Sequence, residues 1–229
     1  MTDQMLRAID AGLNDGLVIP YLGPGVLALA GEDCPQPSSP TALHNYLAAL
    51  PVLPLVVHDW YDDLPQKAPA VRSSWSVWGM AQGVSKADRC GHRVQYLQAD
   101  GKSARAIAPN LAKTWATLLY QPLGSVAPVA EIDNQTPIPE LVQSLRTGRH
   151  FLFLGCRFTR ERDQAFARQI MQRSSATHWA VLPEAPTRNE LRFLAEQNIK
   201  RLDLSLTDFV AALAEARSEE KIQLLLACW

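Results

Sequence analysis

The chain has 229 residues, with 22 basic and 23 acidic side chains and a formal net charge of −1. This balance gives no overall positive field to attract nucleic acid or anionic lipid, so we expect neither as a partner. No apolar run approaches the roughly 20 residues needed to cross a bilayer, so we expect no membrane association. The amphipathic N-terminus carries acidic residues, unlike a secretory signal. We therefore expect a cytoplasmic globular protein.

Strand-like and helix-like segments alternate along the chain. Apolar runs typical of buried strands lie at 17–22, 53–57, 115–121, 150–155, 178–183 and 199–204. Apolar residues at helical spacing lie at 2–15, 41–50, 140–148, 160–173, 187–197 and 207–217. This alternation predicts an α/β, Rossmann-like fold, with a mostly parallel sheet and helices on both faces. We expect a single domain over 1–229, in which residues 64–112 could form a small insertion.

The four cysteines are Cys34, Cys90, Cys156 and Cys228, and they lie far apart in the sequence. No Cys-x-x-Cys pair is present, which argues against a zinc ribbon or an iron–sulfur loop. The spacing therefore predicts reduced thiols and no metal site.

The first predicted strand runs directly into Gly23-Pro24-Gly25. A strand, a glycine turn and a helix in this order can bind the phosphate of a nucleotide. Pro24 has no backbone N–H group to donate. The loss of one neutral hydrogen bond costs about 0.5–1.5 kcal/mol, so on this reasoning the loop is weakened but not abolished. We expect Gly23, Gly25 and the positive end of the following helix to remain available.

Four strand ends together resemble those of bacterial sirtuin-like domains, a Rossmann-type group that includes NAD-cleaving enzymes. The segments are "VIPYLGPGV", "VVHDWYDDL", "LLYQPLGS" and "FLFLGCRFT". The resemblance implies a pocket for NAD or ADP-ribose between the first and last of these segments. The positions that it assigns to cofactor binding are Gly23, Pro24, Gly25, Gly155 and Arg157.

Five positions depart from the family pattern. Trp60 stands where catalytic members have Asn, and Leu123 stands where they have His. Leu123 cannot act as a general base, and the indole of Trp60 offers no acceptor. Pro24 replaces an alanine, while Leu27 and Arg157 each replace a serine. The departures predict a catalytically degenerate protein that retains at most weak binding of NAD or ADP-ribose.

Two alternatives remain open. In the first, the chain is an NAD-cleaving hydrolase with a displaced site, in which His58 is the base and Asp62 supplies a carboxylate. In the second, the chain is a sensor that binds NAD or ADP-ribose without turnover.

A finer resemblance concerns the role of the protein. The segments "AEIDNQTPIPELV" and "FLFLGCRF" are similar to those of sirtuin-like proteins encoded among bacterial nitrogen-fixation genes. This similarity implies an accessory protein whose partner is a nitrogenase component or an assembly factor.

The stretch "CRFTRERDQAFARQIMQR" contains five arginines among acidic residues. One interpretation, which the mixed charge favours, is a solvated helix face with ion pairs. In the other, Arg157 and Arg160 bind a phosphate or the carboxylate of a partner. Trp60 could line either the pocket or an interface.

Overall fold

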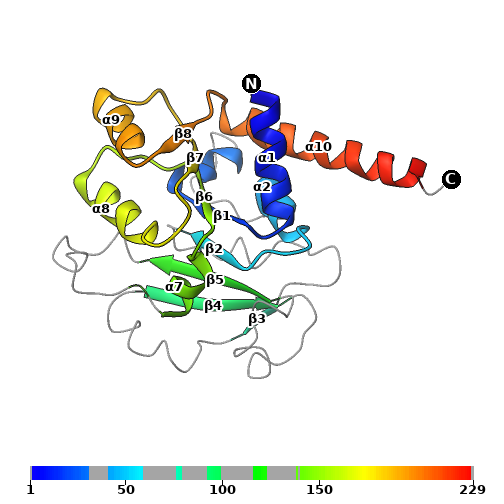
Figure 1. Cartoon of the computed structure of the whole chain (residues 1–229), viewed down its shortest axis with the longest axis horizontal. Helices are drawn as coiled ribbons and strands as arrows, with labels where there is room; N and C mark the ends of the chain where they lie inside the picture. Colours follow the sequence, from blue (N-terminus) through cyan, green and yellow to red (C-terminus); the bar gives the residue numbers. More distant parts are fainter. Residues whose placement is uncertain are drawn as a thin grey trace.

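The computed structural model describes residues 2–30, 41–58, 76–78, 92–98, 116–122, 138 and 140–227. Within these residues, eight strands form one sheet in the order β3-β4-β5-β2-β1-β6-β7-β8 (Figure 1). The strands are β1 (Val18–Leu22), β2 (Leu55–His58), β3 (Ser76–Trp78), β4 (His92–Gln98), β5 (Ala116–Pro122), β6 (His150–Leu154), β7 (His178–Val181) and β8 (Ile199–Arg201). The helices are α1 (Thr2–Asn14), α2 (Ala42–Ala48), α7 (Glu140–Arg146), α8 (Glu161–Ile170), α9 (Arg188–Glu196) and α10 (Leu206–Ala227), and η1 (Pro24–Ala30) is a 3₁₀ helix.

Six neighbouring strands, from β5 through β2, β1, β6 and β7 to β8, pair in parallel. β4 joins β5 antiparallel, and β3 joins β4 antiparallel. The predicted Rossmann-like α/β fold is thus confirmed. β3 and β4 come from the predicted insertion at 64–112 and widen the sheet beside β5. That this region is an insertion within a single domain stays a prediction.

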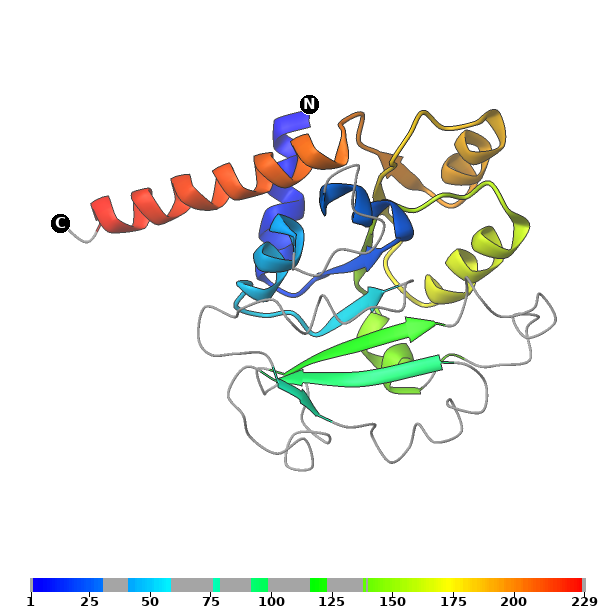
Figure 2. The same cartoon turned by 180° about the vertical axis from the view of Figure 1, so that it is seen from behind.

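Side chains alternate between two cores because β6 is buried on both faces. Phe151 and Phe153 point into one core, and Leu152 and Leu154 point into the other. The core with the two phenylalanines lies under α7, α8 and α9, and the core with the two leucines lies under α1, α2 and α10. Figures 1 and 2 show these helices on the two sides of the sheet. Helices therefore cover both faces, as predicted.

The order of the strands reverses at β1. The chain passes from β1 to β2 on one side, and after β5 it crosses to β6 on the other side of β1. In open parallel sheets, ligands bind outside the carboxyl ends of the strands at such a reversal. The loops that follow Leu22 and Leu154 meet at this point, since these two residues are partners in the ladder.

Two elements differ from the sequence prediction. The segment after the first glycine loop is the 3₁₀ helix η1 rather than an α-helix. α10 extends to Ala227, ten residues beyond the predicted end. Its first part packs against α1, α2 and η1, and the rest extends away from the other described elements (Figure 2). Among the described residues, no helix has the length and apolar character that a membrane crossing requires.

Candidate functional site

The loops after β1 and β6 are joined by backbone hydrogen bonds. The Gly23 N–H donates to Leu154 O at 2.8 Å, and the Gly25 N–H donates to Gly155 O at 2.9 Å. The Val26 N–H turns back to Gly23 O at 3.1 Å. The N–H groups that we expected to be available for a phosphate therefore already have acceptors within the protein. This pattern arises because the two loops leave neighbouring parallel strands in register.

The glycines permit this close approach of the two backbones. A Cβ atom at Gly25 would lie 2.7 Å from Gly155 O, and one at Gly155 would lie 2.5 Å from Val26 N. Gly155 also has a φ of +65°, a left-handed conformation that disfavours other residues. Glycine at these positions is thus explained by packing, without any ligand. Pro24 begins η1, where its fixed φ suits a helical first residue.

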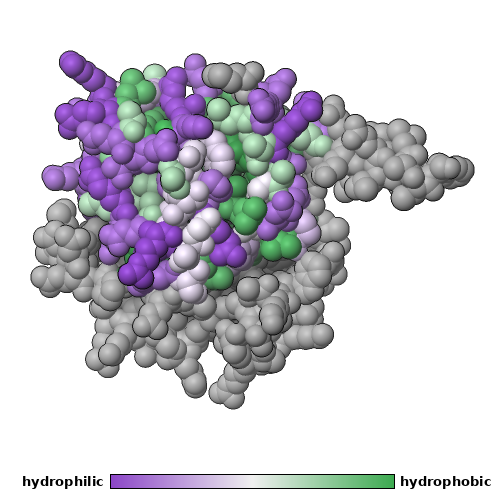
Figure 3. Space-filling view, in the orientation of Figure 1, coloured by the Kyte–Doolittle hydropathy of each residue, from purple (hydrophilic) through white to green (hydrophobic). Residues whose placement is uncertain are grey.

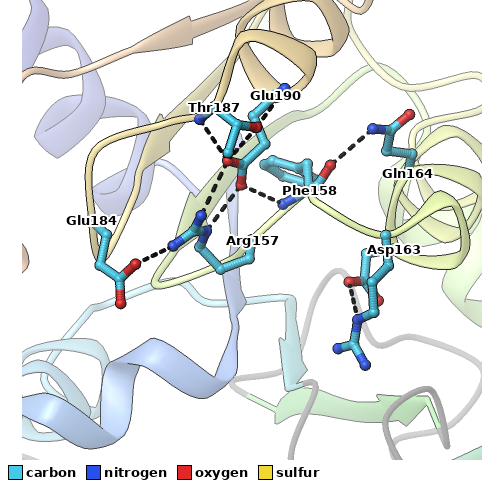
Figure 4. A network of polar contacts seen from close by, with 8 residues as sticks. Arg157, Phe158, Asp163, Gln164, Glu184, Thr187 and Glu190 are labelled. Atoms are coloured by element: carbon cyan, nitrogen blue, oxygen red, sulfur yellow. Dashed lines mark hydrogen bonds and ion pairs between the residues drawn. The ribbon is translucent and has the colours of Figure 1, made fainter.

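Arg157 follows β6 and points toward α9 (Figure 4). Its Nε and Nη2 donate to the two carboxylate oxygens of Glu190 at 2.9 and 3.2 Å. Its Nη1 donates to Glu184, which follows β7, at 2.5 Å. These bonds raise the pKa of Arg157, although burial opposes the shift. Arg157 therefore links the loops after β6 and β7 to α9 through charge-assisted hydrogen bonds.

Glu190 is completely buried, with a side-chain exposure of 0%. Besides Arg157, its donors are the backbone N–H groups of Phe158 and Thr187 and the Thr187 hydroxyl, at 2.9–3.0 Å. Burial alone would raise the pKa of Glu190, but the hydrogen bonds from Arg157, Thr187 and Phe158 outweigh it and lower the pKa to about 2. The carboxylate is therefore charged, paired and inaccessible, which suits a structural role.

Arg160 also has an acidic partner, because its Nε lies 3.0 Å from an oxygen of Asp163. Arg162 lies 3.6 Å from the other oxygen of the same carboxylate. At this end of the arginine-rich stretch, the structure therefore agrees with the interpretation of ion pairs on a helix.

His58 ends β2, beside Leu22 of β1 in the register. Its side chain is buried, and its ring lies 6.4 Å from the ring of His44 on α2, in an edge-on arrangement. The Nδ1 of His44 is in turn 2.8 Å from the hydroxyl of Thr41, which is the N-cap residue of α2. His58 is thus near the strand reversal but inside the core under α2. To act as a general base, the imidazole of His58 would have to become accessible to a bound substrate.

Trp60, Asp62 and Leu123, the other positions assigned to the chemistry, lie outside the described residues. The described residues contain no cluster of three or more potential metal-binding side chains. Cys156 is buried beside the glycine loops, and a Cβ atom at Gly23 would lie 2.8 Å from its sulfur atom.

The carboxylates that bind Arg157 were not predicted from the sequence. One signal was present, because Thr187 and Glu190 form the Thr-x-x-Glu pattern of a capping box. The structure contains this box, with Thr187 as the N-cap residue of α9. The pairing of Glu190 with Arg157, 33 positions earlier, has no local signal.

Comparison with known proteins identifies one related family. A family model described as a SIR2-like domain matches residues 54–202, more than half of the chain. The match includes the loop after β6 and the whole of α9, but it begins after β1 and its glycine loop. A search of the curated proteins finds no match.

Proposed function

Because the chain belongs to the SIR2-like domain family, we propose that it is a member without NAD-cleaving chemistry that acts by binding a partner protein. The observation that carries this proposal is the state of Arg157. It occupies a position where the resemblance places a serine of the ligand loop, and its guanidinium is bound to Glu184 and Glu190. Because the guanidinium already binds two carboxylates, it favours a structural role for this loop over ligand binding.

The backbone at the strand reversal supports the same proposal. A bound phosphate would have to compete with Leu154 O and Gly155 O, which accept the N–H groups of Gly23 and Gly25. To reach the guanidinium of Arg157, it would have to displace a glutamate carboxylate. A neutral hydrogen bond contributes about 0.5–1.5 kcal/mol net, and one to a charged group contributes about 1.5–3 kcal/mol. Competition of this size would weaken the binding of NAD or ADP-ribose by up to about a hundredfold.

The chemistry is tested by incubating the purified chain with NAD and measuring free nicotinamide by chromatography. We expect no release above that in buffer alone. Release at an enzymatic rate would overturn the proposal. If that release were lost in His58→Asn, with the fold retained by circular dichroism, the alternative of a hydrolase with His58 as base would replace it.

Binding without turnover is a separate measurement. Titration calorimetry with NAD and with ADP-ribose should give no heat, or a dissociation constant on the order of 1 mM, corresponding to about 4 kcal/mol. Micromolar binding without nicotinamide release would contradict the proposal and would support the sensor alternative.

We further propose that the partner is nitrogenase or one of its assembly factors. This part rests on the resemblance of "AEIDNQTPIPELV" and "FLFLGCRF" to proteins encoded with nitrogen-fixation genes. The test is affinity purification of the tagged chain from nitrogen-fixing cells, with cells grown on ammonium as the control. We expect a nitrogenase component or assembly factor to be enriched. Recovery of neither would contradict this assignment of the partner.

A further inference from the structure

The charges of the chain are unevenly distributed. Residues 146–201 contain eleven basic side chains, ten of them arginine, and five acidic ones, which gives a net charge of +6. The rest of the chain contains eleven basic and eighteen acidic side chains, a net charge of −7. The overall charge of −1 therefore conceals a strongly basic segment, which includes α8 and α9.

Part of this positive charge lies on an exposed stripe of α9. Arg188, Leu191 and Arg192 follow one another at helical spacing and are all exposed. Leu191 lies between the two arginines in the sequence, and 49% of its surface is accessible. The stripe thus combines two cations with one apolar side chain.

Arg168 of α8 is a further exposed cation, and it contacts the same helix. Its guanidinium carbon lies 5.1 Å from the centre of the Phe193 ring on α9, within the range of a cation–π interaction. Since Phe193 is buried, the aromatic ring supports the guanidinium from below while Arg168 itself stays exposed. Figure 3 shows hydrophilic side chains gathered on the side of the molecule where α8 and α9 lie. We call Arg168, Arg188, Leu191 and Arg192 the arginine face.

Few acidic side chains of the protein pair with the arginines of this face. Among the described residues, neither Arg168 nor Arg188 forms an ion pair. Arg192 has one partner, Glu196, at 3.4 Å, and both side chains are largely exposed, so water screens this pair. The contrast is with Arg157, whose charge is compensated by two carboxylates.

We propose that the arginine face is an interaction surface for an acidic patch on a partner protein. Arginine is enriched at protein interfaces, and its planar guanidinium binds carboxylates in pairs of hydrogen bonds. The exposed Leu191 offers an apolar contact between the cations. This apolar contact favours a protein surface over nucleic acid, whose affinity comes mainly from its phosphates. The inference rests on the proposed function, for which it names the contact surface and the chemistry of the partner.

The test measures binding of fluorescein-labelled poly-L-glutamate by fluorescence anisotropy at low ionic strength. The test variant combines Arg168→Gln, Arg188→Gln and Arg192→Gln. The control variant combines Arg7→Gln, Arg160→Gln and Arg201→Gln, which removes the same charge elsewhere, with Arg160 and Arg201 already paired to carboxylates. We expect the test variant to bind at least about tenfold more weakly than the wild type. The control should bind within about threefold of it, and added salt should weaken all binding.

Four outcomes would overturn the inference. They are an absence of wild-type binding, an equal loss in both variants, tighter binding to single-stranded DNA that the test variant loses, and a salt-sensitive dimer that the test variant loses. The third would assign the face to nucleic acid, and the fourth to a second copy of the chain. Thermal unfolding of both variants identifies any loss of fold. Because this measurement uses neither NAD nor nitrogenase, its failure is distinguishable from a failure of the proposed function.

Discussion

The loops at the carboxyl ends of β1 and β6 and the arginine face on α8 and α9 use similar residues in opposite ways. Arg157 lies against a fully buried carboxylate and joins three segments of the chain. Arg168, eleven residues later, lies over an aromatic ring with no carboxylate partner among the described residues. An arginine near an expected ligand site can thus be structural, while one on an exposed helix surface can be available for binding.

The first prediction concerns the buried ion pair between Arg157 and Glu190. Glu190→Ala should lower the free energy of unfolding by about 2–4 kcal/mol, because it leaves the buried Phe158 N–H without its acceptor and Arg157 without its bidentate partner. Urea denaturation followed by circular dichroism measures the loss. Glu184→Ala is the matched control. It removes a partner whose side chain is 75% exposed and should cost no more than about 1 kcal/mol. Equal losses in the two variants would refute the structural role of Glu190.

The joined glycine loops give the second prediction. Gly155→Ala should lower the free energy of unfolding by about 2–4 kcal/mol, because the new methyl group would meet Val26 N at 2.5 Å in a left-handed conformation. Gly148→Ala is the matched control for backbone strain alone. Gly148 also has a left-handed φ of +71°, but a Cβ atom there would meet nothing within 4 Å. The substitution should cost about 1–2 kcal/mol. If both variants lost the same stability, close contact between the loops would not explain Gly155.

The third prediction concerns pH. Burial, with a smaller repulsion from His150, lowers the pKa of His178 to about 4. The unfolded chain has the higher pKa, about 6.5, and therefore takes up the proton first as the pH falls. Stability from this group should be complete above pH 6.5 and should decline toward pH 4. Glu190, with its lowered pKa, loses its contribution only from about pH 4.5 downward toward pH 2.

The two titrations can be separated by one variant. In His178→Asn, the amide oxygen can replace Nδ1 as the acceptor for the Phe151 N–H, which donates at 3.0 Å. Urea midpoints measured between pH 4.5 and 6.5 should lose most of their slope in this variant. A slope that remained unchanged would show that another group causes it.

The smallest expected effect concerns the exposed arginines. Arg168→Gln should change the free energy of unfolding by only about 0.5–1 kcal/mol, the contribution of an exposed cation–π contact. Arg188→Gln should change it by less than about 0.5 kcal/mol. Thermal unfolding gives both values. A loss as large as that of Glu190→Ala would place Arg168 among the structural residues and would remove the contrast with Arg157.

Much of the fold could be predicted because the signals are local. The run of apolar residues in β6 predicts a buried strand. The helical spacing of Ile9 and Leu13 predicts that α1 is amphipathic. The Thr187–Glu190 pattern also marks the start of α9. The length of α10 was underestimated, because the polar run at 217–221 interrupts the apolar periodicity within the helix.

The meeting of the loops that carry the expected site residues could be predicted, but their polar contacts could not. The sequence placed Gly23, Gly25, Gly155 and Arg157 at the strand reversal, and the structure brings their loops together there. It did not indicate that the glycine N–H groups and the guanidinium have partners within the protein. Those partners lie in β6, in the loops after β6 and β7 and in α9, and no spacing pattern connects them to the loops.

The order of strands and helices and the two-sided core could be predicted from the amino-acid sequence alone. Local hydrophobic periodicity and residue type are sufficient for these. Only the tertiary structure decided that Arg157 is bound to Glu190 and that Arg168 is exposed over Phe193. The physical reason is that the role of a charge depends on the groups around it. Those groups come from distant segments that meet only when the chain is folded.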